Sequence, residues 1–399
     1  MIENSVGRPV RGGNFFDRER ELRLLWQRLA TDHVLLLAPR RVGKTSLLYR
    51  LADDAPQHEL RAVYLTVAHA QREVEFVKAL VDALGSHKDG EGAVKRVSKG
   101  PLKRLLRRTR RIDAGPLSFE FDTSAPDAEQ HWTTMAEELA TAMERLGHAW
   151  LVLVDELPIF VMTLLRQDPT GLRARGFLNW FRDLRNPAGR APRIRWVVAG
   201  SIGLDAVVAR HNVGDTINDL NPVALGAFTP QVADAFLRAL AESYGLVLGD
   251  DVRARVCERA GWLIPFYLQI IFSKLHELAT EHLETPTPAL VDRVVDELLG
   301  PTYRAYFDYW RQRLTEELGH PDDTQALALL SAAARAPEGA SRDVLAQVLG
   351  EHVSDAAERD AQLRYLLDIL ENDGYLVREA DQYRFRSALL REFWVRRVA

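Results

Sequence analysis

The segment APRRVGKT at residues 38–45, directly after the apolar run VLLL at 34–37, constrains this chain most. A strand, a tight loop and a helix in this order form a unit that binds phosphate groups. Backbone N–H groups of such a loop point inward, and the positive end of the helix dipole adds to their attraction for an anion. The pattern therefore predicts a strand at 34–37, a phosphate-binding loop, and a helix at 46–51.

The residues expected around the phosphates have distinct roles. Lys44 would bridge the β- and γ-phosphates, and the Thr45 hydroxyl would ligate Mg²⁺. Ala38 stands where the pattern usually has Gly, which is tolerated if its φ is negative. The alternative is an ordinary turn that contains Gly-Lys-Thr by chance. The residues expected to bind the cofactor here are Pro39, Arg40, Arg41, Val42, Gly43, Lys44, Thr45 and Ser46.

A second motif, WLVLVDE at residues 150–156, is an apolar run that ends in two carboxylates. That composition is typical of a buried parallel strand. Asp155 would hold Mg²⁺, and Glu156 would orient and deprotonate an attacking water. A third apolar strand at 194–201 ends in Ser201, where a γ-phosphate sensor would lie. The alternatives are a core strand with an acidic surface end and a strand-capping serine.

Length and composition limit the class of protein. The chain has 399 residues, 47% hydrophobic and 27% charged, as in ordinary globular proteins with two or three domains. Its only cysteine, Cys257, excludes an intrachain disulfide and fits a reducing cytoplasm. No apolar run reaches 18 residues, so we expect no membrane span and a cytoplasmic location.

The order of elements predicts an α/β fold with a three-layer parallel sheet. Strands are expected at 34–37, 62–67, 150–156 and 194–201, with helices at 19–29, 73–84, 127–146 and 180–184, and a half-exposed strand at 117–122. From residue 229 the pattern becomes helical, which predicts a lid. Three helices and a two-stranded hairpin near the C-terminus predict a winged helix. The expected domains are 1–228 (ATPase core), 229–300 (helical lid) and 301–399 (linking helix and winged helix).

With these segments placed, the chain resembles the STAND-type and archaeal-type P-loop ATPases, which are related to AAA+ and origin-recognition proteins. The matching segments are FFDRERE at 15–21, with Asp17 where Gly is usual, the 38–45 loop, DELP at 155–158, GWLIPFYL at 261–268 and the C-terminal YRFRSALLREFW at 383–394. The resemblance implies ATP or ADP as the ligand, because the residues themselves carry no base-specific signature.

The resemblance also implies residues around the base. Phe15, Phe16 and Arg18 would line the adenine side, and Pro265 would close over the base or ribose from the lid. The two phenylalanines could instead form a hydrophobic staple before a helix, and Pro265 could simply start one. For an arginine delivered to a neighbouring subunit's nucleotide, Arg210 is the better candidate and Arg185 the poorer. The alternative, a solvated surface arginine, is favoured over this role.

Two features bear on partners. From Lys88 to Arg111 there are ten basic and two acidic residues, a local net charge of +8. This segment could contact DNA or an acidic protein, or be a solvated insertion, and its lack of aromatic residues disfavours base stacking. In the expected third helix of the winged helix only Gln362 and Arg364 suit base reading, which favours protein docking.

The sequence therefore predicts a Mg²⁺-dependent ATPase that acts as a nucleotide-driven regulatory or defence switch. The alternative is a DNA-binding loader ATPase of the origin-recognition kind, and a nucleotide-binding scaffold with negligible hydrolysis stays open. Besides ATP, the expected partners are an unidentified protein and, for the alternative, DNA. The oligomeric state is not predicted beyond allowing a homo-oligomer.

Overall fold

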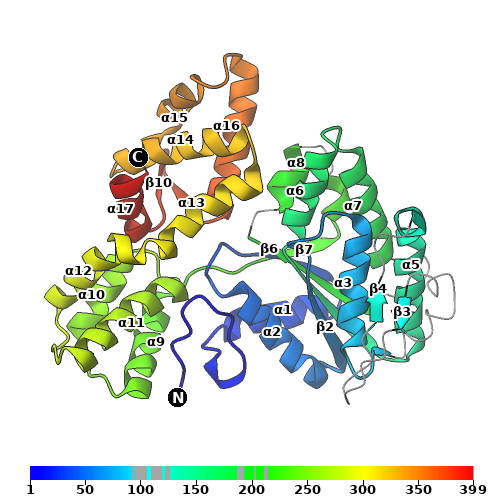
Figure 1. The fold of residues 1–399 in the computed structure, drawn as a ribbon, viewed down its shortest axis with the longest axis horizontal. Coiled ribbons are helices and arrows are strands. Elements are labelled where there is room, and N and C mark those ends of the chain that lie inside the picture. The colour runs from blue at the N-terminus through cyan, green and yellow to red at the C-terminus, as the bar shows by residue number, and fades with distance from the viewer. Residues whose placement is uncertain are drawn as a thin grey trace. The chain divides into compact units, whose positions relative to one another are not determined.

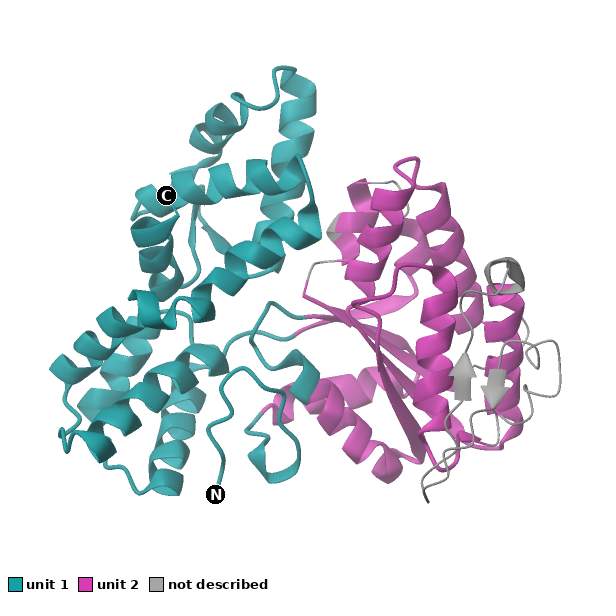
Figure 2. Ribbon diagram, viewed as in Figure 1, with its two compact units in different colours: residues 1–17, 38–46, 225–399 teal, residues 18–37, 47–224 magenta. Residues whose placement is uncertain are grey.

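The computed structural model describes residues 1–91, 94, 106–108, 119–121, 126–186, 193–201, 204–210 and 214–398. The chain forms two compact units, shown in Figure 2. Unit 1 contains Met1–Asp17, Ala38–Ser46 and Leu225–Ala399, and unit 2 contains Arg18–Leu37 and Leu47–Ala224. The basic segment predicted to contact DNA lies mostly outside the described residues, as do the side chains of its Arg107 and Arg108.

Unit 2 is built around a five-stranded parallel sheet in the order β2-β5-β6-β1-β7. Helices flank the sheet, as Figure 1 shows. The strands are β1 (His33–Leu37), β2 (Leu60–Thr66), β5 (Ala149–Asp155), β6 (Ile194–Gly200) and β7 (Leu220–Ala224). The main helices are α1 (Glu19–Leu29), α2 (Lys44–Asp54, which begins in unit 1), α3 (Glu73–Gly85), α5 (Pro126–Arg145), α6 (Leu157–Gln167), α7 (Leu172–Arg185) and α8 (Leu204–Arg210).

The strand order creates a point where the connections diverge. The chain leaves β1 toward β2, in one direction across the sheet, and leaves β6 toward β7, in the other. Right-handed crossovers place these two connections on opposite faces of the sheet. Open α/β sheets bind ligands at such a point, beyond the carboxyl ends of the strands. The crevice is therefore expected where β1 and β6 end.

A cluster of aromatic side chains fills the core above β6. Phe76 of α3 lies 5.3 Å from Phe177 of α7, and Phe177 lies 5.0 Å from Phe160 of α6, between ring centroids. Phe181 of α7 packs edge-on against Trp196 of β6 at 5.2 Å. The apolar run of α6, buried from Leu157 to Leu165, closes this layer. The cluster fixes α6 on the sheet, and with it the start of α6, where the carboxylate pair lies.

Two short antiparallel strands complete unit 2: β3 (Leu106–Arg108) pairs with β4 (Phe119–Phe121). Sequence alternation predicts β4, and the predicted helices and central strands are observed with ends within a few residues, except that α7 is longer than predicted. Among the strands and α-helices, the sequence does not predict β3, β7, β8 (Ala340–Ser341), α6 and α8. The apolar face of α6 extends all round the helix, so no helical period stands out, and β7 contains Asn221 and Pro222, which strands tolerate mainly at a sheet edge.

Unit 1 is mainly helical. Its first helices are α9 (Pro230–Tyr244), α10 (Asp250–Ala260), α11 (Pro265–Glu281) and α12 (Pro288–Leu298), three of which start with Pro. Then follow α13 (Ala305–Leu318), α14 (Asp322–Arg335), α15 (Arg342–Leu349), α16 (Ala356–Asn372) and α17 (Ala388–Arg397). The short strand β8 (Ala340–Ser341) and the hairpin of β9 (Leu376–Glu379) and β10 (Gln382–Phe385) form a sheet in the order β8-β10-β9.

The C-terminal part of unit 1 has its own aromatic core. Trp310 of α13 lies 5.1 Å from Tyr375, and Tyr375 lies 6.2 Å from Trp394 of α17. All three side chains are fully buried, and the Tyr375 hydroxyl donates to the Trp310 carbonyl at 2.6 Å. This core ties α13, the residue before β9, and α17 together. The helix and hairpin order predicted for this segment is the order observed, while the three domain boundaries stay predictions.

Candidate functional site

The carboxyl edge of the unit 2 sheet brings three predicted residues together. β5 ends in Asp155, which pairs in register with Ala199 of β6, and Glu156 and Ser201 follow these two strands directly. Ser201 donates to Glu156 Oε2 through its backbone N–H at 3.2 Å and its hydroxyl at 3.3 Å. Asp155 is 3% exposed and accepts the Tyr64 hydroxyl on Oδ2 at 3.0 Å. The sequence predicts the two carboxylates and the serine, but not the hydrogen bonds between Ser201 and Glu156.

The backbone at Glu156 is strained. Its φ is 62°, in the left-handed region that non-glycine residues rarely adopt. Gly200, opposite, allows the approach of α6, because a Cβ there would lie 2.4 Å from the ring of Pro158. Strain of this kind persists only where the surroundings hold it, and it often marks a functional site. Here the left-handed conformation of Glu156 turns its carboxylate toward Ser201 at the end of β6.

Burial and charge act together on Tyr64. Burial raises the pKa of its hydroxyl, and the neighbouring Asp155 carboxylate raises it further. The hydroxyl therefore stays protonated and remains a donor to Asp155. A donor to one carboxylate oxygen fixes the orientation of the group, as partners of metal-binding carboxylates do. No sequence signal marks Tyr64, which occupies a strand position next to β5.

The β1–α2 loop (residues 38–43) begins at the same edge of the sheet. Leu37, the last residue of β1, pairs in register with Gly200 of β6, so the chain enters the loop where β6 ends. Within the loop Arg41 and Gly43 have positive φ, 63° and 97°, and Ala38 does not. The condition under which Ala can replace Gly at residue 38 is therefore met. Lys44 and Thr45 are the first residues of α2, so their backbone N–H groups lie at its amino end, where the helix dipole is positive.

The β1–α2 loop fits a bound phosphate in two respects. A Cβ built on Gly43 meets nothing within 4 Å, so there is open space beside this residue. Among the described residues, Arg40 Nη1 and Arg41 Nε are buried without a hydrogen-bond partner, which leaves donors for an anion. The oxygen donors of Thr45 and Asp155 are the hard ligands that Mg²⁺ prefers.

Some predicted loop side chains have other contacts. The Ser46 hydroxyl accepts the Val10 N–H at 3.0 Å, which attaches the N-terminal segment to α2. Arg40 forms ion pairs with Glu317 and Asp373, and the Arg41 guanidinium lies over the rings of Phe266 and Tyr309, at 4.3 and 4.5 Å. Contacts from these three residues to a nucleotide stay predictions.

The residues predicted around the base are distributed over both units. Phe16 of unit 1 packs against Phe236 of α9, with ring centroids 5.2 Å apart. Arg18 of unit 2 is 5% exposed and pairs with Glu21 at 3.1 Å. Asp17 has a φ of 57°, which explains why Gly is usual there, since Asp tolerates this region better than most residues. Pro265 is the first residue of α11, which agrees with the alternative that it simply starts a helix. The roles of Pro265 and Phe15 at the nucleotide stay predictions.

The two finger candidates differ in their surroundings. Arg185 is fully buried, and its guanidinium pairs with Asp219 at 2.8 Å and donates to the Thr216 carbonyl. It is therefore a core arginine, and the expectation that it could reach a neighbouring subunit is wrong. Arg210 is exposed at the end of α8 and remains the candidate.

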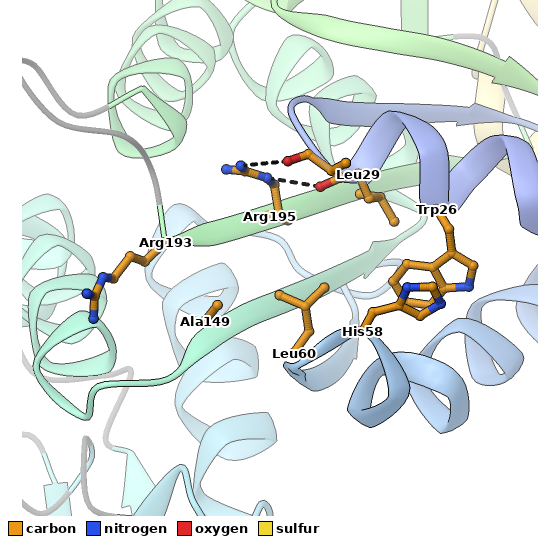
Figure 3. A pocket seen from close by; sticks show the side chains of 8 residues that line it. Trp26, Leu29, His58, Leu60, Ala149, Arg193 and Arg195 are labelled. Carbon is orange, nitrogen blue, oxygen red and sulfur yellow. Dashed lines mark hydrogen bonds between the residues drawn. The ribbon is translucent and has the colours of Figure 1, made fainter.

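A separate pocket of about 330 Å³ opens at the amino ends of the strands, beside the first residues of β2 and β5 (Figure 3). The Trp26 and His58 rings stack there at 3.8 Å, and Arg195 donates to the Leu29 and Ala30 carbonyls. The hydrogen bonds from Arg195 satisfy carbonyl groups at the C-terminal end of α1. Because the pocket lies at the opposite edge of the sheet from Asp155 and Ser201, it does not belong to the predicted nucleotide site.

None of the helices in the described part of the chain combines the length and the apolar character that crossing a membrane requires. None of its His, Cys, Asp and Glu residues gather in threes as a metal-binding group. A Mg²⁺ ion held by one carboxylate, one hydroxyl and phosphate oxygens does not need such a group.

No family model and no curated protein matches the sequence. Among solved structures, a Walker-type ATPase of Pyrococcus abyssi is similar, with 17% identity, 97% of this chain and 98% of that chain covered, and a TM-score of 0.63. Cdc6p of Pyrobaculum aerophilum has 13% identity, coverages of 97% and 98%, and a TM-score of 0.46. At these identities the likeness concerns the fold alone, and only the first TM-score supports it. The predicted fold class, a parallel α/β sheet with flanking helices, is confirmed.

Proposed function

We propose that this chain is a Mg²⁺-dependent ATPase that works as a slow nucleotide-driven switch. The observation that carries the proposal is the hydrogen-bonded pair of Glu156 and Ser201 at the sheet edge where the β1–α2 loop begins. A base and a phosphate sensor on adjacent strand ends, with a Gly-Lys-Thr loop leaving the next strand, suit hydrolysis of a terminal phosphate. The fold shared with a Walker-type ATPase supports the same activity.

Each group has a defined part in this proposal. Lys44 and the N–H groups at the start of α2 would neutralise the β- and γ-phosphates. Thr45 and Asp155 would hold Mg²⁺, which when bound offsets negative charge on the phosphates. Glu156 would take a proton from water, and Ser201 would hold Glu156 in place until a phosphate oxygen competes for its hydroxyl. The sensing step would therefore begin with Ser201.

The proposed switch needs a second element that responds to the nucleotide. We take this to be the C-terminal segment of α14 to β10, interpreted as a winged helix of the STAND type. The two residues of its third helix, α16, that suit base reading both have partners within this segment. Gln362 donates to Asp322 and Gln325 at 2.7 and 2.6 Å, and Arg364 pairs with Asp360 at 2.7 Å. This favours protein docking over reading of DNA.

Nucleotide binding is tested by calorimetry with Mg·ATP. Lys44→Ala removes a charged hydrogen-bond donor, so affinity should fall roughly ten- to a hundredfold. Lys78→Ala, a lysine on α3 that is 40% exposed, serves as the matched control and should bind like the wild type. Equal affinity of Lys44→Ala and wild type would show that the loop is not the nucleotide site.

The alternative, a DNA-handling ATPase, is favoured by the +8 charge between Lys88 and Arg111. If that segment contacts a duplex, affinity should fall with salt at a log–log slope near −0.9 per phosphate neutralised. Replacement of Arg104, Arg107, Arg108 and Arg111 with Ser should then flatten the slope. The switch proposal instead expects duplex affinity on the order of 10 μM or weaker at about 150 mM salt. Submicromolar affinity that the quadruple variant loses would favour the alternative.

A further inference from the structure

Three consecutive residues of the β1–α2 loop contact the C-terminal part of unit 1. Pro39 lies against Gly374, where an added Cβ would come within 3.0 Å of the Pro39 Cβ. Arg40 Nε donates to both carboxylate oxygens of Asp373 at 2.8 Å, and another of its nitrogens pairs with Glu317. The partners of Arg40 are 277 and 333 residues away in the sequence. The loop is therefore attached to the C-terminal segment by its own residues.

The ion cluster is buried and balanced in charge. The side chains of Arg40, Glu317 and Asp373 are 4%, 6% and 1% exposed. Arg313 adds a second cation, because its Nε donates to Glu317 at 2.6 Å. Burial opposes the charge on Arg40, but the two carboxylates outweigh it and raise the pKa of its guanidinium. Removal of one partner of such a buried ion pair strongly destabilises the fold, because the other charge is left buried and uncompensated.

The carboxylates occupy the ends of two helices. Glu317 lies in the last turn of α13, and Asp373 directly follows α16 and begins the turn that leads into β9. The next residue, Gly374, has a φ of 88°, which only glycine adopts readily. Tyr375 follows and is anchored on Trp310 of α13. A shift of either helix end would therefore move the partners of Arg40.

The loop has a conformation that needs such support. Arg41, next to Arg40, has a φ of 63°, and Gly43 has a φ of 97°. A non-glycine residue in the left-handed region is held there by its surroundings, and here the Arg41 guanidinium lies over the Phe266 and Tyr309 rings. Contacts at residues 39–41 thus fix the loop immediately before the glycine and lysine that would meet the phosphates.

We propose that Asp373 and Glu317 act through Arg40 as positioning residues that hold the β1–α2 loop in its phosphate-binding shape. Nucleotide binding at the loop and packing of the α13 and α16 ends on the loop are then coupled. Because such coupling is reciprocal, a nucleotide on the loop must also tighten the C-terminal contact. This inference rests on the proposed function, since it specifies how the same site is regulated.

The test uses the whole 399-residue chain and Mg·ADP, which is not turned over. Asp373→Asn keeps the shape but removes the charge that holds Arg40, so affinity should fall at least tenfold and the dissociation rate should rise. The matched control is Asp296→Asn, which breaks an exposed pair with Arg396 in the same unit and should change nothing. Glu317→Gln should act like Asp373→Asn and serves in its place if that variant does not fold.

Amide hydrogen exchange provides a readout that a purely structural role would not change. The Asp373 and Tyr375 N–H groups donate to the Ile369 and Leu370 carbonyls, so their exchange reports opening at the end of α16. Mg·ADP should slow this exchange in the wild type and not in Arg40→Ala. Binding within twofold of wild type in both carboxylate variants, or exchange that Mg·ADP leaves unchanged, would overturn the inference alone. Absence of Mg·ADP binding by the wild type would overturn the proposed function and the inference with it.

Discussion

Glu156 and Ser201 are linked by two hydrogen bonds, of 3.2 Å from the Ser201 N–H and 3.3 Å from its hydroxyl, both to Oε2. The two residues follow adjacent strands and are 45 residues apart in the sequence. The carboxylate is thus held by the residue proposed to sense the phosphate. A phosphate oxygen that takes the Ser201 hydroxyl would leave Glu156 with one of its two donors from that residue.

Ser201→Ala removes the hydroxyl and keeps the backbone donor. A hydrogen bond to a charged group contributes about 1.5–3 kcal/mol, so ATP turnover should fall roughly ten- to a hundredfold. Affinity for Mg·ATP should change much less, because Lys44 and the helix start are intact. Phosphate release and calorimetry on the same sample separate the two effects. An unchanged turnover would remove Ser201 from the site.

Gly43→Ala tests the loop conformation against a matched glycine. Gly43 and Gly147 have φ of 97° and 79°, and an added Cβ meets nothing within 4 Å at either. Alanine at each site should therefore cost a similar stability, about 1–3 kcal/mol of backbone strain. Only Gly43→Ala should weaken Mg·ATP binding, by tenfold or more, as measured by calorimetry. Equal binding by the two variants would mean that the loop does not contact the phosphates.

Tyr64→Phe removes the hydroxyl that donates to Asp155. Loss of a group that orients a metal-binding carboxylate typically costs ten- to a hundredfold in metal affinity. The Mg²⁺ concentration for half-maximal ATPase activity should rise accordingly, while the maximal rate changes little. Tyr306→Phe, on α13, is the control. If Mg²⁺ dependence is the same in all three proteins, Asp155 does not hold the ion.

The burial of His33 predicts that the stability of the fold decreases in acid. The Nδ1 atom of His33 accepts the backbone N–H of Trp196 at 3.2 Å, so Nε2 carries the proton and donates to the Arg185 carbonyl at 3.0 Å. Burial lowers the pKa of His33 from 6.5 to about 4. The unfolded chain then binds a proton between pH 6.5 and 4 that the folded chain does not, so stability falls as pH decreases through this window.

The loss attributable to His33 is about 3 kcal/mol across that window. Urea unfolding at pH 7, 5.5 and 4.5 measures it. Because carboxylates also titrate near pH 4, the comparison is with His33→Gln, which should be less stable at pH 7 but lose less stability on acidification. Parallel pH profiles for the two proteins would show that His33 titrates in both states alike.

The fold could be predicted where the sequence carries local signals. α1 runs from Glu19 to Leu29 as its apolar period indicates, and α9, α11 and α12 begin at their prolines. The carboxylate strand β5 was equally clear from its unbroken apolar run. α6 and β7 were not predictable, since the first is apolar on every face and the second contains a proline that its edge position alone permits.

In the candidate site too, residues with a local sequence signal could be predicted and residues brought together by the fold could not. Asp155, Glu156 and Ser201 are predictable because each comes at the end of an apolar run, and parallel strands end at one edge. The partners of Arg40 are not, because Glu317 and Asp373 come from distant helix ends and no local pattern marks them. Tyr64 cannot be predicted for a similar reason, since only the pairing of β2 with β5 brings it to Asp155.

The most direct test of the account compares binding and turnover in Glu156→Gln. The substitution keeps the shape of the side chain and its hydrogen-bond acceptor but removes the base. Mg·ATP should bind with near wild-type affinity, while hydrolysis should fall roughly a hundredfold or more, as for the loss of a general base. Hydrolysis by Glu156→Gln at the wild-type rate would contradict the central claim that this carboxylate activates the water.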